Sequence, residues 1–497
     1  MFNLLIFCKY FIFFLTFLII GFLNIIFYKI TGNCNNNLLI VLYNLINLNG
    51  CILIKFVQWI LSHYKILDNE NSTVIDLFSK FYENCKVHNI EYTKKIFKHD
   101  FGLDFDDVFR IDNNFSVKSG SIAQVYKANF KNKKLCNEIF NLDISNNFSN
   151  DMSIAIKVVH PEVEYQMVFP ILFFKLYKFM VSNIGFLKRY NTPFNFDSFF
   201  DNLKCQIDMK NEYKNMHYYY NYYSDNQFIV IPKPIISSKN FLIMEYVDGT
   251  PFEKMDLSEL KNYELITIFN IFTKNNYMFL DFIHADLHDL NWKIKRKNQD
   301  NDIVDDNNID YQFVIYDFGY VLENNIKITF QKLTFYIVSN NFDKLAVLLY
   351  DNIINNDMIL EEFSDKFNAY SKQFNLNATD NDYIKVLYKF CFDNNYYLKN
   401  NLLEIFISLI LFKKYIDKYV LNKNHNKNSN FIIQQNLFSK NICKKYNIFT
   451  DMKNYIEEYF VNNDSLIDNY EISKDLNDMY NDIGCDISNS SFQSFSI

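Results

Sequence analysis

Two short runs in the second half of the chain carry the residue types and spacing that phosphoryl-transfer chemistry needs. The first is His284-Ala-Asp-Leu-His-Asp-Leu-Asn291, and the second is Asp317-Phe-Gly319. In the first run, Asp286 could accept or orient the hydroxyl proton of an acceptor, and Asn291, reached by a loop reversal, could give an oxygen to Mg²⁺. Asp317 could bridge this metal to nucleotide phosphates, because hard cations prefer carboxylate and amide oxygen. Together the runs predict the metal-and-base half of a phosphoryl-transfer site.

Residues for the other half of such a site lie upstream, in the order that protein kinases use. Lys157 lies in the alternating run Ile154–Val158, where it would bind the α- and β-phosphates of a nucleotide. A carboxylate must hold this lysine in place, and Glu212 on the next predicted helix is the best placed to do so. Lys157 and Glu212 are therefore assigned, with Asp286, to the catalytic set.

Two further segments complete the predicted nucleotide site. Ser119-Gly120-Ser121 directly precedes a predicted strand and could cover the phosphates as a turn of free backbone N–H groups. Met244–Gly249 follows a strand and has the character of a hinge between lobes, where the backbone at Glu245 and Val247 would contact adenine. The sequence thus predicts ATP or ADP as the nucleotide and Mg²⁺ as the metal.

The elements that must position these residues change along the chain from mixed to mainly helical. Short β-branched or aromatic runs predict strands at 121–130, 153–160, 228–236 and 241–247. Residues 197–223 have helical spacing of apolar residues, with Asp197 as a predicted N-cap. From Asp256 the pattern becomes mostly helical to about Tyr419, and Asp256 with Glu259 is placed as a capping box.

Several runs together resemble the UbiB/ADCK (aarF-domain-containing kinase) family of atypical, protein-kinase-like proteins. They cover roughly residues 44–349 and comprise SIAQVY, KVVHP, NEYKNM, MEYVDG, HADLH and DFG, which begin at residues 121, 157, 211, 244, 284 and 317. The resemblance implies an α+β, protein-kinase-like bilobal fold, with a small mixed α/β N-lobe and a mainly helical C-lobe. It adds a helical N-terminal extension.

The resemblance also implies a regulatory lid over the active site. Lys55-Phe-Val-Gln58 is similar to the family's K-x-G-Q motif, with Val57 in place of glycine, and Gln206-Ile-Asp208 is similar to its E-x-D motif. Lys55, Gln58 and Asp208 are assigned to this lid on that ground. The family further implies a membrane-associated kinase or ATPase linked to ubiquinone or other isoprenoid-lipid metabolism, with a quinone-like or isoprenoid membrane lipid as partner. Phosphorylation of proteins is not the implied activity.

Alternatives remain open at several of these residues. Lys204, Asp208 and Glu212 are spaced i, i+4, i+8 and could form a surface ion-pair ladder. His284, Asp286 and His288 could instead be the core of a metallohydrolase site, although His284 fits better as a structural brace of its loop. A third reading is a catalytically inactive, nucleotide-gated lipid-binding or scaffold pseudokinase.

The N-terminus predicts a membrane anchor. No charged residue occurs from Tyr10 to Tyr28, a run long enough to span a bilayer, and a cleaved signal peptide is the alternative. Lys9 and Lys29 flank the run and give no orientation. A second apolar stretch, 38–54, is broken by Asn and Gly and is interpreted as a partly buried helix of the following domain. We therefore expect a single-pass membrane protein with its kinase-like domain on an ATP-containing side, cytosol or mitochondrial matrix.

Composition limits the function classes. The 497 residues are 49% hydrophobic and 22% charged, which excludes a disordered, collagen-like or coiled-coil protein. A net charge of −7 argues against a general nucleic-acid binder. Nine scattered cysteines without a C-x-x-C pair favour a reducing compartment over a disulfide or zinc framework. Whether the chain forms a homodimer is left open.

The expected organisation has five parts. Residues 1–30 form the anchor or signal and 31–115 the helical extension with the K-x-G-Q-like motif. Residues 116–250 form the N-lobe with an inserted loop at 131–152, and 251–420 form the C-lobe with a polar insertion at 297–311. Residues 421–497 form a linker and an acidic tail.

Overall fold

A computed structural model describes most of the chain up to residue 399 and a few residues beyond it. The described residues are 4–67, 73–82, 85–131, 153–185, 196–288, 291–297, 311–338, 341–354, 358–372, 380–399, 402, 405–406, 409–410, 443–444, 449, 451 and 454–455. The predicted insertion at 131–152, except Lys131, and most of that at 297–311 lie outside this set, as does the acidic tail. The limits proposed for the five parts therefore remain predictions.

The chain divides into two compact units, which are described separately. Unit 1 comprises 1–222, 232–247 and the short segment 317–320, and unit 2 comprises 223–231, 248–316 and 321–497. The predicted α+β class is confirmed, because unit 1 combines an antiparallel sheet with helices and unit 2 is mainly helical with two small sheets.

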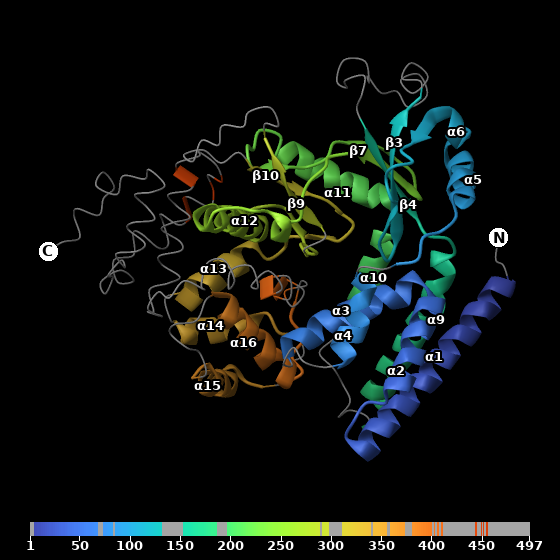
Figure 1. The fold of residues 1–497 in the computed structure, drawn as a ribbon. Coiled ribbons are helices and arrows are strands. Elements are labelled where there is room, and N and C mark those ends of the chain that lie inside the picture. Colours follow the sequence, from blue (N-terminus) through green and yellow to red (C-terminus); the bar gives the residue numbers. More distant parts are fainter. Residues whose placement is uncertain are drawn as a thin grey trace. The chain divides into compact units, whose positions relative to one another are not determined.

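Unit 1 opens with a group of helices, drawn in blue in Figure 1. These are α1 (Leu4–Thr31), α2 (Asn36–Asn49), α3 (Cys51–Leu67), α4 (Thr73–Ser79) and the 3₁₀ helix η1 (Lys80–Tyr82). The predicted helix at 38–54 is in fact split between α2 and α3 at Gly50, whose φ of +93° favours glycine. A Cβ at Gly50 would also lie 2.3 Å from Gln166 Oε1, so the turn brings α2 and α3 close to α9 (Val163–Asn183).

The sheet of unit 1 has the order β1-β3-β4-β7-β6, with β2 paired to β3, and all its pairings are antiparallel. Its strands are β1 (Phe109–Ile111), β2 (Lys118–Ser119), β3 (Ala123–Phe130), β4 (Ile154–Val159), β6 (Pro234–Ser237) and β7 (Phe241–Glu245). Three of the four predicted strands are therefore confirmed, while the run at 228–236 forms two short strands, β5 (Ile229–Val230) in unit 2 and β6 in unit 1.

Alternation along β4 decides which way Lys157 points. Ile154, Ile156 and Val158 join one core with residues of α5 (Ile90–Phe101) and α6 (Phe105–Val108). Because side chains of a strand alternate between its two faces, Lys157 lies on the opposite face. That is the face on which α11 (Met209–Tyr222) runs (Figure 1).

The segment predicted as one helix, 197–223, is two helices. α10 (Phe196–Gln206) begins one residue before Asp197, so the prediction of Asp197 as N-cap is wrong. α11 begins after Asp208, whose Oδ1 accepts a hydrogen bond from the Lys210 amide at 3.0 Å. This is the geometry of an N-cap, and it starts a new helix where a single one was expected.

Unit 2 is built around α12 (Glu259–Met278). Its N-cap is Ser258, whose Oγ accepts from the Lys261 amide at 3.4 Å, so the capping box placed at Asp256 is wrong. Two small sheets accompany this helix, one in the order β5-β10-β9 and one pairing β11 with β8. The strands are β8 (Phe282–His284), β9 (Trp292–Arg296), β10 (Tyr311–Ile315) and β11 (Val321–Glu323). The remaining elements are η3 (Phe252–Lys254), α13 (Lys327–Val338), α14 (Phe342–Asp351), α15 (Leu360–Ser371) and α16 (Asp380–Asp393).

Candidate functional site

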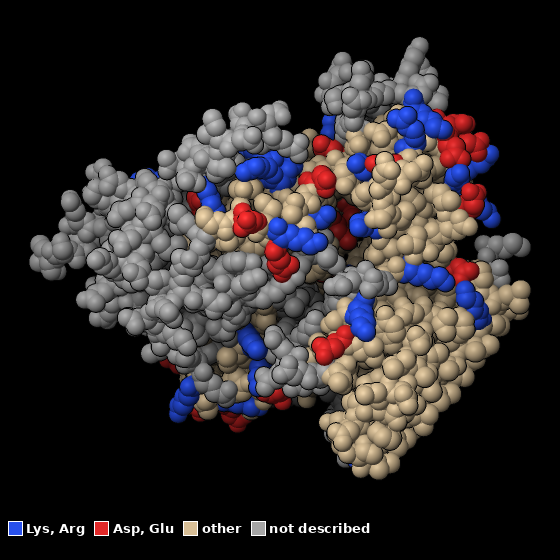
Figure 2. Space-filling view, viewed as in Figure 1, with Lys and Arg blue, Asp and Glu red and all other residues tan. Residues whose placement is uncertain are grey.

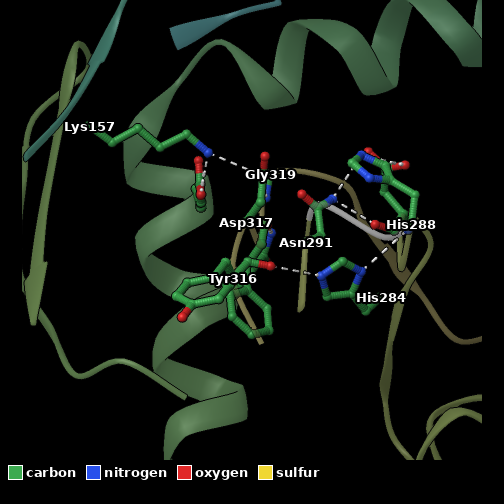
Figure 3. A network of polar contacts seen from close by, with 11 residues as sticks. Lys157, His284, His288, Asn291, Tyr316, Asp317 and Gly319 are labelled. Atoms are coloured by element: carbon green, nitrogen blue, oxygen red, sulfur yellow. Dashed lines mark hydrogen bonds and ion pairs between the residues drawn. The ribbon is translucent and has the colours of Figure 1, made fainter. Parts of the chain in front are cut away.

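Three of the predicted site residues meet within unit 1. Lys157 Nζ lies 2.7 Å from Glu212 Oε1 and 2.9 Å from Asp317 Oδ1, and Figure 3 shows these contacts. The side chain of Glu212 is 1% exposed and that of Lys157 is 11% exposed, whereas that of Asp317 is 44% exposed. One strand, one helix and the segment 317–320 thus bring one ammonium and two carboxylates together, with Asp317 the most accessible of the three.

Burial and mutual attraction act against each other on these charges. Burial raises the pKa of Glu212 to about 7, although Lys157 opposes this rise. Burial alone would lower the pKa of Lys157, but Asp317 and then Glu212 outweigh it and raise that pKa. For Asp317, burial would raise the pKa, but Lys157 and then Lys55 hold it below its usual range. Asp317 is therefore the ionised partner of Lys157, whereas burial destabilises the ionised form of Glu212.

Residues on α11 fix the position of Asp317 through its neighbour Phe318. Phe318 is fully buried and packs against Tyr219, with ring centroids 5.0 Å apart, and its carbonyl accepts from Asn215 Nδ2 at 3.0 Å. We did not single out Asn215 or Tyr219 from the sequence. Their spacing from Glu212, i+3 and i+7, places all three on one face of the helix. This spacing could have identified Asn215 and Tyr219 from the sequence.

The predicted phosphate turn is the tip of a hairpin between β2 and β3. The Gly120 amide donates to the Ala123 carbonyl at 2.9 Å, so it is not one of the free N–H groups that the sequence predicts. Ser119 Oγ donates to the Lys86 carbonyl at 3.2 Å. A Cβ at Gly120 would make only an ordinary contact, 3.5 Å from the Ala123 carbonyl oxygen, so local packing does not require glycine there.

The predicted hinge segment contains the boundary between the two units. The second segment of unit 1 ends at Val247, which is buried, and unit 2 resumes at the next residue. Glu245, at the end of β7, accepts from the Lys233 amide at 3.3 Å through its carboxylate. The contact of Glu245 and Val247 with adenine remains a prediction.

Gly249 lies where this segment passes close to β9 inside unit 2. A Cβ there would lie 2.8 Å from Lys293 Cβ and 3.2 Å from the Ile294 carbonyl oxygen. We expect Gly249→Ala to lower the free energy of unfolding by about 1–3 kcal/mol, because the added methyl group would force Lys293 Cβ and the Ile294 backbone to move away. Chemical denaturation measures this change. Gly185→Ala, which meets nothing within 4 Å, is the matched control and should change it little; equal effects of the two substitutions would contradict the prediction.

In unit 2, His284 and Asn291 shape the loop that carries Asp286. His284 is fully buried, its Nδ1 accepts from the Asp286 amide at 3.3 Å, and its Nε2 lies 3.4 Å from the Tyr316 carbonyl oxygen. Because Nδ1 accepts, Nε2 carries the proton and donates to Tyr316. Asn291 Nδ2 donates to the Asp286 carbonyl at 2.7 Å, which makes the expected loop reversal. His284 thus acts as a brace, as predicted.

The side chain of Asn291 presents an oxygen that suits a metal. Both of its hydrogen bonds within the described part of the chain, to the Asp286 carbonyl and to His288 Nε2, use Nδ2, so Oδ1 is left as an acceptor. An amide oxygen here and the accessible carboxylate of Asp317 are donors that Mg²⁺ prefers. Each of these two groups, within its own unit, is therefore a type of donor that fits the predicted ion.

The metallohydrolase alternative fits less well. Both ring nitrogens of His284 are used by Asp286 and Tyr316. Among the described residues, moreover, no group of three or more His, Cys, Asp or Glu side chains could hold a metal ion.

The three lid residues have different surroundings. Lys55 contributes to lowering the pKa of Asp317, after Lys157, so its charge acts on the site. Gln58 donates to the Phe81 carbonyl at 2.9 Å, inside the extension itself. Asp208 caps α11. The surface-ladder alternative is wrong, because Lys204 pairs with Asp201 at 2.7 Å and Glu212 pairs with Lys157.

A comparison with protein-family models finds a match in the middle of the chain. Residues 145–349 match the model described as the ABC1 atypical kinase-like domain. This part of the chain is an ABC1 domain. The match confirms the resemblance to the UbiB/ADCK family, and the matched range includes Lys157, Glu212, Asp286 and Asp317. The phosphate turn lies upstream of the range.

Curated relatives of the ABC1 domain are distant. The chain is 26% identical over 277 residues to a protein of Dictyostelium discoideum named probable serine/threonine-protein kinase abkC, covering 54% of this chain and 36% of the relative. It is 25% identical over 252 residues to a mitochondrial ABC1 family protein of Saccharomyces cerevisiae (49% and 37%), and 25% over 301 residues to the ABC1 family protein MCP2 of the same yeast (58% and 48%). The chain thus matches between about a third and a half of each relative's length.

Two solved structures show weak similarity to the chain. A complex of Rv3197 with erythromycin from Mycobacterium tuberculosis is 17% identical, with a TM-score of 0.40 and coverage of 67% of this chain and 83% of that one. A Rio2 kinase complex with ADP, Mg²⁺ and phosphoaspartate from Chaetomium thermophilum is 12% identical, with a TM-score of 0.25 and coverage of 71% and 72%. Both scores are low, and the kinase-like fold therefore rests on the architecture and on the ABC1 match.

Proposed function

We propose that the ABC1 domain binds ATP or ADP with Mg²⁺ and acts as an atypical kinase or ATPase. The observation that carries this proposal is the contact of Lys157 with both Glu212 and Asp317 inside unit 1. A protein kinase uses a strand lysine held by a helix glutamate for the α- and β-phosphates, and a D-F-G aspartate for the metal. Names of some relatives also describe them as probable kinases.

Each residue of the site has a distinct task in this proposal. Lys157 would bind the α- and β-phosphates, and Glu212 would keep its ammonium in place. Asn291 and Asp317 would hold Mg²⁺, which supplies charge compensation to the phosphates when it is bound. Asp286 would orient or deprotonate the acceptor, a lipid hydroxyl or water, from a loop that His284 braces.

We further propose that α1 and its neighbours attach the protein to a membrane. α1 has 28 residues, about 42 Å at 1.5 Å per residue, and is long and apolar enough to cross a bilayer. Its first half packs on α9, with Phe7 and Phe11 ring centroids 4.7 Å and 5.3 Å from that of Phe169. Lys9 Nζ also pairs with Glu162 Oε2 at 2.7 Å. α1 is therefore part of a helical group rather than an isolated helix.

Exposed apolar side chains continue from α1 onto α2 and α9. The surface over these helices in Figure 2, toward the lower right, is almost free of charged side chains. We call this set the apolar helical surface; its members are Phe11, Ile12, Leu15, Ile19, Phe22, Leu23, Ile25, Ile26, Ile30, Ile40, Val41, Leu48, Leu172, Leu176 and Phe179. So large an apolar surface supports contact with lipid acyl chains.

Insertion of Trp tests whether α9 contributes to that surface. We expect the emission added by Leu176→Trp to be quenched by brominated lipids in vesicles, because Leu176 is 55% exposed on α9. Ile359→Trp, at a 61% exposed site in unit 2, is the matched control and should keep its emission. The two native tryptophans give the background, which wild type measures. If the emission added by Leu176→Trp is not quenched, α9 does not contact lipid.

An isoprenoid or quinone-like lipid is the partner that the family resemblance favours, and relatives include a mitochondrial protein. We propose such a lipid as the acceptor or the ligand, with the ABC1 domain on the matrix or cytosolic side of its membrane.

The proposed nucleotide site is tested on the full chain in lipid nanodiscs, because removal of α1 would expose Phe169 of α9. The melting temperature is measured with ADP or ATP, with and without Mg²⁺. A ligand that binds only the folded state raises stability by RT ln(1 + [L]/Kd). A Mg²⁺-dependent rise supports the kinase or ATPase. No rise with any nucleotide would contradict it, and a rise without hydrolysis in the presence of lipid would favour the pseudokinase.

A further inference from the structure

Two histidines lie in contact beneath the β2–β3 hairpin of unit 1. His88 precedes α5, and His160 follows β4, three residues after Lys157. Their Nδ1 atoms are 2.9 Å apart, and His160 Nε2 is 3.0 Å from the Gly120 carbonyl oxygen. The pair therefore connects the tip of the hairpin to the chain segment that joins the N-terminal helices to α5.

Both rings are neutral near neutral pH. Burial lowers the pKa of His88 to about 4, and His160 adds to this effect. Burial also lowers the pKa of His160, with the Gly120 carbonyl opposing. Two neutral imidazoles whose Nδ1 atoms are in hydrogen-bond contact must share one proton between these atoms.

The partners of the pair determine where each proton lies. A carbonyl oxygen only accepts, so His160 Nε2 carries a proton and donates to Gly120. His160 Nδ1 is then an acceptor, and His88 Nδ1 must donate to it. This leaves His88 Nε2 to accept from Thr93 Oγ1, which lies 3.0 Å away.

The same direction of donation continues to the core of the sheet. Tyr126 OH lies 3.0 Å from Thr93 Oγ1 and donates to it, and Gln124 Nε2 donates to Tyr126 OH. Gln124 is fully buried and also holds the His88 backbone, since its Oε1 accepts from the His88 amide at 2.8 Å and its Nε2 donates to the His88 carbonyl at 3.2 Å. One directional chain of hydrogen bonds thus runs from β3 to the tip of the hairpin.

We propose that His160, oriented by His88, is a positioning residue that fixes the turn at Gly120 for binding nucleotide phosphates. The inference rests on the nucleotide binding proposed above and adds two residues to it. A turn that is already fixed loses less conformational entropy when it orders around a ligand, so its fixation favours binding. Neither histidine contacts the nucleotide in this proposal; both act on the turn through the Gly120 carbonyl and through Ser119 Oγ, which lies 3.4 Å from His160 Nε2.

The test combines nucleotide affinity with hydrogen exchange on the full chain in nanodiscs. We expect His160→Leu to weaken the Kd for Mg-ADP about five-fold, because one hydrogen bond to the turn is lost. Exchange of the 119–123 amides should become faster even without nucleotide. His160→Gln should remain within about twofold of wild type in both measurements, because its amide can still donate to Gly120.

A second pair of variants separates positioning from general destabilisation. His88→Leu should match His160→Leu, and the double variant should lose no more than either alone, since both interrupt one chain. His217→Leu, at an exposed histidine on α11, is the control and should change neither readout. Unchanged exchange at 119–123 in His160→Leu, or a Gln variant as weak as the Leu variant, would overturn the inference.

Failure of the proposed function gives a different result. If wild type binds no nucleotide, the proposed function fails and so does the task assigned to the turn. The exchange measurement still reports whether the histidine chain holds the hairpin. Binding by wild type together with no loss in either Leu variant overturns the positioning role alone.

Discussion

Asp317→Asn is expected to abolish the Mg²⁺-dependent rise in melting temperature with nucleotide and to lower ATP turnover by about a thousandfold. Asp317 is the accessible carboxylate of the site, with 44% of its side chain exposed, and its pKa is held below the usual range by Lys157 and Lys55, which outweigh burial. It is therefore ionised at neutral pH and able to offset metal charge. Asparagine keeps the shape of the side chain but carries no charge.

The backbone makes asparagine the right replacement. Asp317 has a φ of +53°, in the left-handed region that Asn and Asp tolerate better than other residues with a Cβ. Alanine would therefore add backbone strain to the loss of charge. Glu212 still pairs with Lys157 in the variant, so we expect the nucleotide-free protein to melt close to wild type.

The matched control is Asp201→Asn, which removes a carboxylate that is 70% exposed on α10 and paired with Lys204. It should change neither the nucleotide response nor the turnover. A turnover in Asp317→Asn within severalfold of wild type would contradict the proposed mechanism.

The sequence alone was sufficient to predict the site where one short pattern determines the local geometry. The alternation in Ile154–Val158 places Lys157 on the face opposite the core, and the order of the motifs singles out Glu212 as its partner and Asp317 as a metal ligand of the same site. The structure brings the three together and adds a direct contact between Lys157 and Asp317. Spacing alone also identified the loop reversal between Asp286 and Asn291.

The features that the sequence missed depend on contacts between distant segments. The break before α11 arises because Asp208 caps a helix, while the apolar spacing of the segment continues through it. His88 and His160 are 72 residues apart, and nothing in either local sequence predicts that their rings touch. The Gly120 amide is occupied because of how β2 pairs with β3, which the composition of the turn does not reveal.

Lys157→Met is expected to lower the free energy of unfolding by up to about 4 kcal/mol above pH 7, where Glu212 is ionised in wild type. The substitution keeps much of the volume but leaves Glu212, only 1% exposed, without its cation. Asp317 loses the same partner at a site that is 44% exposed, where water compensates for much of the loss. Most of the expected cost therefore comes from Glu212. Equilibrium denaturation of the full chain in nanodiscs measures it.

The pH dependence of that cost identifies Glu212 as its source. Burial already raises the pKa of Glu212 to about 7 against the opposing effect of Lys157, and removal of the lysine raises it further. The folded variant then binds a proton that the unfolded chain releases near the ordinary value of 4.5. Folded wild type also binds this proton below about pH 7, so the cost of the substitution grows mainly as the pH rises above 7, at up to about 1.4 kcal/mol per pH unit, until the further raised pKa of Glu212 in the variant is reached.

The double variant Lys157→Met with Glu212→Gln removes both charges. It should recover most of the lost stability, and its stability should no longer show the pH dependence that Glu212 causes. Lys204→Met, which breaks the exposed pair with Asp201, should cost less than about 1 kcal/mol and serves as the control. If the double variant were no more stable than Lys157→Met, the loss would come from packing around residue 157. The uncompensated charge of Glu212 would then not explain why residue 157 must be a lysine.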